Sequence, residues 1–158
     1  MRILYICTHN RCRSILSEAI TNHYGKGQLT GASAGSQPVG EVHPLSLHYL
    51  AETGVKTEGL RSKSWDEMQS FLPDVVVTVC DSAASEPCPL WFDDTLVLHW
   101  GLTDPSKLDG CEEDIRAAFL ETIAIIKTRV SGLVALAEQN LPTEALRLAL
   151  RELAQTQC

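Results

Sequence analysis

The residues best suited to chemistry lie in one short stretch, Cys7-Thr8-His9-Asn10-Arg11-Cys12-Arg13-Ser14. An apolar, β-prone run at residues 3–6 precedes it and a helical pattern follows it, so a strand should lead through a tight loop into a helix N-terminus. Free backbone N–H groups and the helix dipole at such a junction favour a tetrahedral oxyanion. We therefore predict an oxyanion site formed by Thr8, His9, Asn10, Arg11, Cys12 and Arg13.

Cys7 stands at the lip of this predicted site. A helix N-terminus and a nearby guanidinium lower the pKa of a thiol below its ordinary value of about 8.5, so we expect Cys7 to act as a thiolate nucleophile. Arg13 can fold back and hold the same anion with its planar fork, and Ser14 can donate a hydrogen bond to the thiolate. The structural alternative is a small buried cysteine that ends a strand. A Cys-x5-Arg-Ser pattern at a strand-to-helix junction is much rarer than a lone cysteine, which favours catalysis.

The composition is that of an ordinary globular protein of 158 residues, with 44% hydrophobic and 21% charged residues, and it predicts one domain with a sizeable core. The formal net charge of −7 argues against broad nucleic-acid binding, so an anion site must be built locally, as by Arg11 and Arg13. No long apolar segment suggests a membrane span or a signal peptide, and we expect a cytoplasmic location.

Strand and helix patterns alternate along the rest of the chain. Beyond the first strand we predict strands at 29–34, 74–79 and 95–99, and helices at 14–24, 44–52, 64–71 and from 112 onward, with a break at Pro142. Ser64 is suited to cap the 64–71 helix, and the long helix carries an apolar stripe of Ile115, Phe119, Ile123, Ile126 and Val130. This alternation implies a parallel sheet covered on both faces, in which ligands bind beyond the carboxyl ends of the strands. Cys7, Cys80 and Asp104 all fall at or just after such ends.

Taken together, the Cys7–Ser14 stretch resembles the phosphate-binding loop of the low-molecular-weight protein tyrosine phosphatase superfamily, and Asp104-Pro105 resembles its general-acid motif. The likeness extends through Glu18, residues 33–35, 43–44 and 99–101. It implies a four-stranded parallel sheet flanked by helices. We expect a phosphatase-like domain at 1–131 and a helical C-terminal extension at 132–158, packed on the same domain.

Within that superfamily, Cys80 and Cys88 are similar to the extra cysteine pair of the arsenate reductases that recycle through thioredoxin. The resemblance implies reduction of arsenate to arsenite, with phosphate or sulfate as mimics of the substrate, for arsenic detoxification. A disulfide would pass from Cys7–Cys80 to Cys80–Cys88. The implied reductant is external, thioredoxin or alternatively glutathione with glutaredoxin, and no bound cofactor or metal is implied. The predicted catalytic residues are Cys7, Arg13, Ser14, Cys80, Cys88 and Asp104.

Other functions remain alternatives at this stage. A phosphatase acting on phosphotyrosine or small phosphate esters would use the same loop, although Ser106 and Lys107 stand where tyrosine phosphatases of this fold carry aromatic residues. A redox sensor or oxyanion-binding regulator would use it without turnover. Seven residues separate Cys80 from Cys88, where some thioredoxin-linked relatives have six.

Three further features have more than one interpretation. Cys12 is either a reserve thiol that protects Cys7 or a packing residue. A zinc site formed by Cys80, Cys88 and His99 matches no familiar spacing. Some relatives bind potassium through positions similar to Asn10, Glu18 and Ser33, but a cationic Lys63 disfavours such a site here.

Overall fold

The computed structural model describes residues 1–25, 27–80 and 95–156. Its helices and strands follow the predicted alternation and differ from the predicted bounds by a residue or two. In chain order they are β1 (Arg2–Cys7), α1 (Arg13–Tyr24), β2 (Thr30–Gly35), α2 (Pro44–Glu52), the 3-10 helix η1 (Trp65–Phe71), β3 (Val75–Thr78), β4 (Leu96–His99), the 3-10 turn η3 (Pro105–Lys107), α4 (Glu112–Glu138) and α5 (Thr143–Thr156).

The four strands form one parallel sheet in the order β2-β1-β3-β4. Its central strands are continuous apolar runs, and every residue of β3 is buried, as expected for a sheet covered on both faces. In the register, Cys7 lies opposite Gly35, and Ile6 lies opposite Thr78. The carboxyl ends of β1, β2 and β3 therefore meet at one edge of the sheet.

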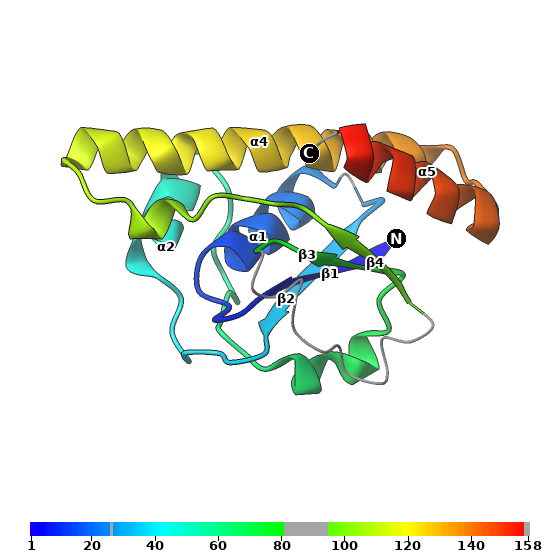
Figure 1. Ribbon diagram of the computed structural model, residues 1–158, viewed down its shortest axis with the longest axis horizontal. Helices are drawn as coiled ribbons and strands as arrows, with labels where there is room; N and C mark the ends of the chain where they lie inside the picture. The colour runs from blue at the N-terminus through cyan, green and yellow to red at the C-terminus, as the bar shows by residue number, and fades with distance from the viewer. Residues whose placement is uncertain (26, 81–94, 157–158) are drawn as a thin grey trace.

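Helices cover the sheet mainly on one side (Figure 1). Helix α1 lies between the sheet and the long helix α4, and α2 packs against α4 as well. The apolar stripe predicted on α4 faces the core: Phe119, Ile123, Ile126 and Val130 are buried, and Ile115 is half-buried against the same core. The 3-10 helix η1 lies on the other side of the sheet.

The segment 64–71 was predicted as a helix, and it forms one of the tighter 3-10 type. Ser64 caps it as expected, in a capping box whose second member is Glu67. The segment ends at Leu72, whose backbone is left-handed at φ 52°.

The C-terminal residues continue the same packing. Helix α4 runs without a break to Glu138, and α5 places Leu150 and Ala154 in the shared core. The domain boundary at 131/132 stays a prediction. In the part of the chain that the structure describes, no helix is long and apolar enough to cross a membrane.

Candidate active site

The loop between β1 and α1 turns its carbonyl groups outward. The carbonyl of Thr8 accepts from the Gln37 N–H at 2.8 Å, that of His9 from the Ser62 hydroxyl at 3.2 Å, and that of Arg11 from the His43 N–H at 2.9 Å. In a trans peptide the N–H points opposite to the C=O. The N–H groups that follow these carbonyls therefore point into the loop, where they can bind an anion.

Two residues make this tight loop fit the strand beside it. Asn10 is fully buried and has a φ of 49°, a left-handed conformation that asparagine tolerates better than most residues. Gly35 ends β2 directly against the loop, and a Cβ there would lie 2.6 Å from the Thr8 carbonyl oxygen. Any side chain at position 35 would push the strand and the loop apart.

Cys7 and Cys80 lie in contact, because β1 and β3 are neighbours and end at the same edge. Both are buried, reduced thiols, and the two are hydrogen-bonded to each other. The Thr8 hydroxyl also lies 3.7 Å from the Cys80 sulfur. The structure thus brings together two of the three cysteines predicted for the relay, and Cys88 lies outside the described residues.

The contact with Cys80 overturns the expectation that Cys7 is acidic in the substrate-free protein. Its pKa lies above the ordinary value, first because of the hydrogen bond with Cys80 and then because of burial and the charge of Cys80. The Arg13 charge and the His9 N–H lower the pKa, as predicted, but they do not outweigh these effects. The groups that lower this pKa are close to Cys7 in sequence, whereas the opposing thiol, Cys80, lies two residues beyond the end of β3.

Arg13 points one edge of its guanidinium at Leu102 and Asp104. Nη1 donates to the Leu102 carbonyl at 3.0 Å, and Nη2 lies 3.5 Å from Asp104 Oδ2. Its Nε is buried and has no hydrogen-bond partner within the described structure. A buried N–H left open in this way costs free energy unless a ligand accepts its hydrogen bond.

Asp104 is held by the turn that follows it. Its Oδ1 accepts from the Ser106 N–H at 2.9 Å and from the Ser106 hydroxyl at 2.6 Å. Oδ2 is the oxygen that lies towards Arg13. The hydrogen bonds from Ser106 to Oδ1 thus orient the carboxyl group, and Oδ2 is the oxygen that can transfer a proton.

These groups surround a cavity of about 80 Å³, which we call the oxyanion cavity. One water takes about 30 Å³ in the liquid, so this space suits a small ion rather than an aromatic ring. Its lining residues are Cys7, Thr8, His9, Arg11, Cys12, Arg13, Cys80, Asp104 and Lys107.

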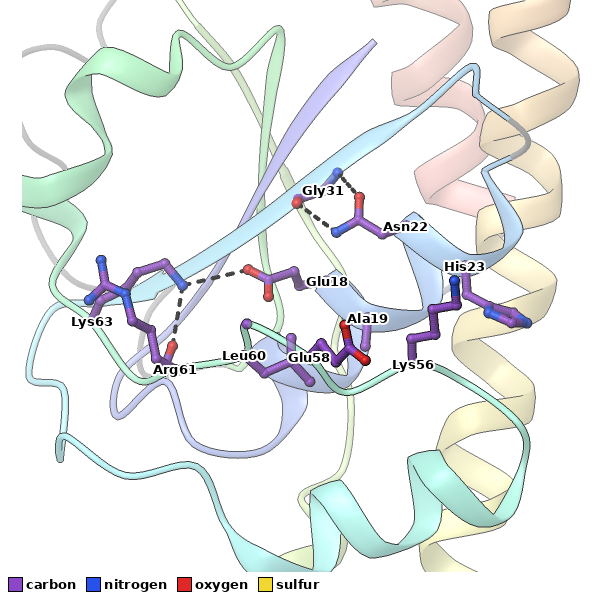
Figure 2. Close-up of a pocket in the computed structure, with 11 residues that line it drawn as sticks. Glu18, Ala19, Asn22, His23, Gly31, Lys56, Glu58, Leu60, Arg61 and Lys63 are labelled. Atoms are coloured by element: carbon purple, nitrogen blue, oxygen red, sulfur yellow. Dashed lines mark hydrogen bonds and ion pairs between the residues drawn. The ribbon is translucent and has the colours of Figure 1, made fainter.

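A second, larger cavity of about 720 Å³ lies beside α1, which contributes Glu18, Ala19, Asn22 and His23 to its lining (Figure 2). None of its lining residues belongs to the predicted site. Glu18 and Lys63 form part of its wall.

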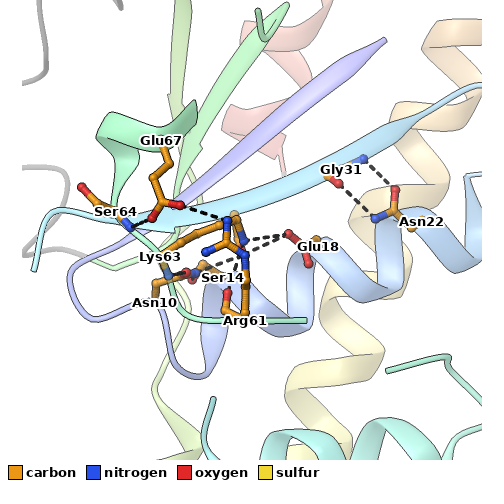
Figure 3. Close-up of polar contacts among 10 residues, drawn as sticks. Asn10, Ser14, Glu18, Asn22, Gly31, Arg61, Lys63, Ser64 and Glu67 are labelled. Carbon is orange, nitrogen blue, oxygen red and sulfur yellow. Dashed lines mark hydrogen bonds and ion pairs between the residues drawn. The ribbon is translucent and has the colours of Figure 1, made fainter. Parts of the chain in front are cut away.

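A polar network joins this second cavity to the loop (Figure 3). The Asn10 amide donates to Ser14 Oγ at 2.8 Å and to Ser33 Oγ at 3.0 Å. Ser33 in turn donates to Glu18 Oε1 at 3.2 Å, and Lys63 Nζ lies 3.5 Å from the same oxygen. We call these five residues the Glu18–Lys63 network.

The predicted site residues that the structure describes divide into two groups. Apart from Asn10 and Ser14, which support the loop from the Glu18–Lys63 network, all of the described ones line the oxyanion cavity. The predicted hydrogen bond from Ser14 to Cys7 stays a prediction. Burial raises the pKa of Cys12 to about 11 despite hydrogen bonds with Ser46 and Ser106, which fits a packing role at neutral pH.

Sequence reasoning did not identify Ser106 and Lys107 as site residues. Ser106 holds Asp104, and Lys107 adds a third cation beside Arg11 and Arg13. A serine two residues after an aspartate that caps a turn is the signal that was available for Ser106.

Among the described residues no group of three His, Cys, Asp or Glu side chains is placed to hold a metal ion. The zinc alternative includes Cys88, which lies outside those residues.

Comparison with known proteins identifies the family. The family model of low molecular weight phosphotyrosine protein phosphatases matches residues 2–145. The chain belongs to this family. The resemblance seen in the sequence is thereby confirmed.

The similar proteins within this family include several arsenate reductases. The chain is 32% identical to an arsenate reductase of Halalkalibacterium halodurans, over 74% of this chain and 83% of the relative. It is 27% identical to a glutaredoxin arsenate reductase of Synechocystis, over 85% of this chain and 96% of the relative.

Solved structures of arsenate reductases share the fold. One in a phosphate-binding state superposes with a TM-score of 0.69 at 25% identity, covering 85% of this chain and 96% of the other. A thioredoxin-dependent arsenate reductase of Corynebacterium glutamicum has a TM-score of 0.67 at 27% identity, covering 89% of this chain and 63% of the other. These relatives differ in their reductant, thioredoxin in one case and glutaredoxin in another.

Proposed function

We propose that this protein reduces arsenate to arsenite. The observation that carries the proposal is the contact between the thiols of Cys7 and Cys80 at an oxyanion-sized cavity. A phosphatase of this fold hydrolyses its cysteine adduct with water and has no need of a second thiol against the nucleophile. A reductase needs such a thiol. The names of the similar proteins support the same activity.

Arsenate has the shape and charge of phosphate, and its oxygens would accept hydrogen bonds from the loop N–H groups and from Arg13 Nε. Two thiols in contact share one negative charge, because the second cannot ionise beside the first. Arg13 and the His9 N–H lower the pKa of Cys7 but do not outweigh Cys80 and burial in the substrate-free protein, so Cys7 takes up this charge only as arsenate binds and accepts its proton, while Cys80 stays protonated.

In the first step the Cys7 thiolate attacks arsenic and forms a sulfur–arsenic bond. One arsenate oxygen leaves as water after taking a proton from Asp104 Oδ2, the carboxyl oxygen that Ser106 does not engage. Arg13 offsets the negative charge that develops.

In the second step Cys80 gives its proton to an oxygen on arsenic, and the resulting thiolate attacks the sulfur of Cys7. The two electrons of the sulfur–arsenic bond pass to arsenic, which leaves as arsenite, and a Cys7–Cys80 disulfide forms. Cys88 then attacks Cys80, which restores the Cys7 thiolate and leaves a Cys80–Cys88 disulfide. An external dithiol protein reduces that disulfide.

The reductant is tested by a coupled assay that follows NADPH oxidation with arsenate. One arm contains thioredoxin and thioredoxin reductase, and the other contains glutathione, glutaredoxin and glutathione reductase. Turnover only in the first arm supports the three-cysteine relay with thioredoxin. Turnover in neither arm contradicts the proposal and favours a regulator that binds oxyanions without turnover.

Phosphatase activity is the second candidate, and the matching family description favours testing it. The small cavity and the presence of Ser106 and Lys107 after Asp104-Pro105 disfavour an aromatic substrate. Para-nitrophenyl phosphate is the matched probe. Hydrolysis of this ester together with no arsenate turnover would replace the reductase proposal by a phosphatase.

A further inference from the structure

A buried ion pair lies beneath the loop and takes no part in the proposed steps. Glu18 comes from α1, and Lys63 comes from the segment that precedes η1. Their side chains are only 10% and 9% exposed, respectively. Removing two charges from water is costly, so a buried pair of this kind contributes little to stability by itself. Its contacts suggest a different use.

The pair is joined to the loop by hydrogen bonds that run in one direction. An ionised carboxylate only accepts hydrogen bonds, so Ser33 must give its single hydroxyl proton to Glu18. The Ser33 oxygen can then only accept, and it accepts from the Asn10 amide nitrogen. The charge on Glu18 thus fixes the direction of the Ser33 hydroxyl, which presents its oxygen to the Asn10 amide nitrogen.

Lys63 contacts both Glu18 and Asn10, the two ends of this chain of hydrogen bonds. Its ammonium lies against Glu18, and its backbone N–H donates to Asn10 Oδ1 at 2.9 Å. The ammonium also donates to the Arg61 carbonyl at 3.2 Å, which holds it in place. Asn10 is the loop residue with the left-handed backbone, so its side-chain bonds determine whether the loop keeps its shape.

We propose that Lys63 is a positioning residue for the oxyanion-binding loop: its ammonium keeps Glu18 charged, the charged Glu18 orients the Ser33 hydroxyl, and Ser33 together with the Lys63 backbone N–H holds the Asn10 amide. This inference rests on the proposed oxyanion-binding role of the loop. A neutral Glu18 would be able to donate a proton to Ser33, and the fixed direction of the bonds would be lost.

The pKa of Glu18 is consistent with this role. Burial raises that pKa above its ordinary value, and the charge of Lys63 is the largest influence that lowers it. Without Lys63, burial would raise the pKa of Glu18 further, because the largest influence that lowers it would be missing. The other charged groups at this cavity are Lys56, Glu58 and Arg61, and Arg61 is paired with Glu67.

The larger cavity makes the proposal testable by chemical rescue. Glu18 and Lys63 both line it, so a small amine in solution can reach the position of a missing lysine ammonium (Figure 2). Lys56 lines the same cavity and is exposed, so its substitution is a matched control.

The experiment measures the affinity for inorganic phosphate by calorimetry in wild type, Lys63→Met, Lys63→Arg, Glu18→Gln/Lys63→Met and Lys56→Met. We expect Lys63→Met to weaken phosphate binding by about tenfold. Lys63→Arg and the double variant should stay within a few-fold of wild type, because arginine keeps the charge and the neutral glutamine carbonyl still accepts from Ser33. Methylammonium should restore binding to Lys63→Met and leave wild type and Lys56→Met unchanged.

The outcomes separate this inference from the proposed function. Phosphate binding by wild type with equal binding by Lys63→Met overturns the inference alone. No phosphate binding by wild type overturns the oxyanion-binding role itself. A double variant as impaired as Lys63→Met, with no effect of methylammonium, indicates simple packing and overturns the inference. If Lys63→Met does not fold, the double variant carries the test, because folding with near-normal phosphate binding supports charge compensation and a tenfold loss contradicts it.

Discussion

The oxyanion cavity and the Glu18–Lys63 network lie on either side of the same loop and are built in opposite ways. In the cavity, the Nε of Arg13 is buried without a partner, and the loop N–H groups point inward. In the network, the Asn10 amide uses both its oxygen and its nitrogen in hydrogen bonds, and the charges of Glu18 and Lys63 neutralise each other in an ion pair. A site that binds a substrate must leave donors open, at about 1–3 kcal/mol for each buried one, whereas the scaffold behind it must leave none.

Because of this difference, substitutions in the oxyanion cavity should affect the reaction, and substitutions in the Glu18–Lys63 network should affect the shape of the loop. Changes in the cavity should remove reaction steps while the fold persists. Changes in the network should weaken anion binding through the position of Asn10. The following predictions test the cavity side of the comparison.

The largest effect is expected for Cys7→Ser. Arsenate reduction should fall to background, because a serine hydroxyl has a far higher pKa than a thiol and is a poor nucleophile here. Circular dichroism should show an unchanged fold, since serine is nearly isosteric with cysteine. Substantial turnover by this variant would place the nucleophile elsewhere.

Cys80→Ser and Cys88→Ser should both stop multiple turnovers, but at different stages. Without Cys80 the Cys7 adduct should not release arsenite unless an outside thiol attacks. Without Cys88 one arsenite per protein should be released, and a Cys7–Cys80 disulfide should accumulate. Peptide mapping under non-reducing conditions, after one equivalent of arsenate, distinguishes this species from the Cys80–Cys88 disulfide of wild type. Full multi-turnover activity of both variants with thioredoxin would contradict the relay.

Arg13→Lys should lower kcat/KM for arsenate by about a hundredfold to a thousandfold. A lysine ammonium keeps the charge, but it cannot replace the planar fork that contacts Leu102 and Asp104 and leaves Nε for the anion. Steady-state kinetics beside Lys107→Met, a cation at the rim of the same cavity, provides the control. A small loss in Arg13→Lys beside a larger loss in Lys107→Met would mean that only local charge matters.

Asp104→Asn should slow formation of the Cys7–arsenic adduct by about a hundredfold if Asp104 is the general acid. Binding of phosphate should change much less, because asparagine can keep the hydrogen bonds from Ser106 to its side-chain oxygen. Rapid-quench measurement of adduct formation checks this. A rate equal to that of wild type would assign proton donation to another group.

The smallest effect concerns ionisation of Cys7. Its pKa is raised first by the contact with Cys80, so Cys80→Ser should move the ionisation of Cys7 to lower pH. A serine hydroxyl donates to the thiolate and carries no competing negative charge. The rate of alkylation of Cys7 by iodoacetamide, followed against pH, should therefore rise at a lower pH in this variant. A midpoint that stays or moves to higher pH would show that burial, and not Cys80, controls the thiol.

Local features of the fold could be predicted because they depend on neighbours in the chain. The helix at Pro44–Glu52 has both predicted bounds, and the capping of η1 by Ser64 was predicted from residues within three positions. The loop from Cys7 to Arg13 was recognised in the same way. Its residue types and spacing describe a strand, a turn and a helix start, and all three are local.

The alternating parallel fold and the oxyanion loop could thus be predicted from residue types and spacing, and the resemblance named Cys80 as the partner of Cys7. The contact between the two thiols comes from folding, because it depends on β1 and β3 being neighbours in register. The same contact reversed the expected direction of the Cys7 pKa, since burial and a second thiol outweigh the local helix N-terminus and Arg13. Likewise, the sequence presented Lys63 only as a cation that disfavours potassium. Folding places its ammonium against Glu18, where two charges removed from water must neutralise each other.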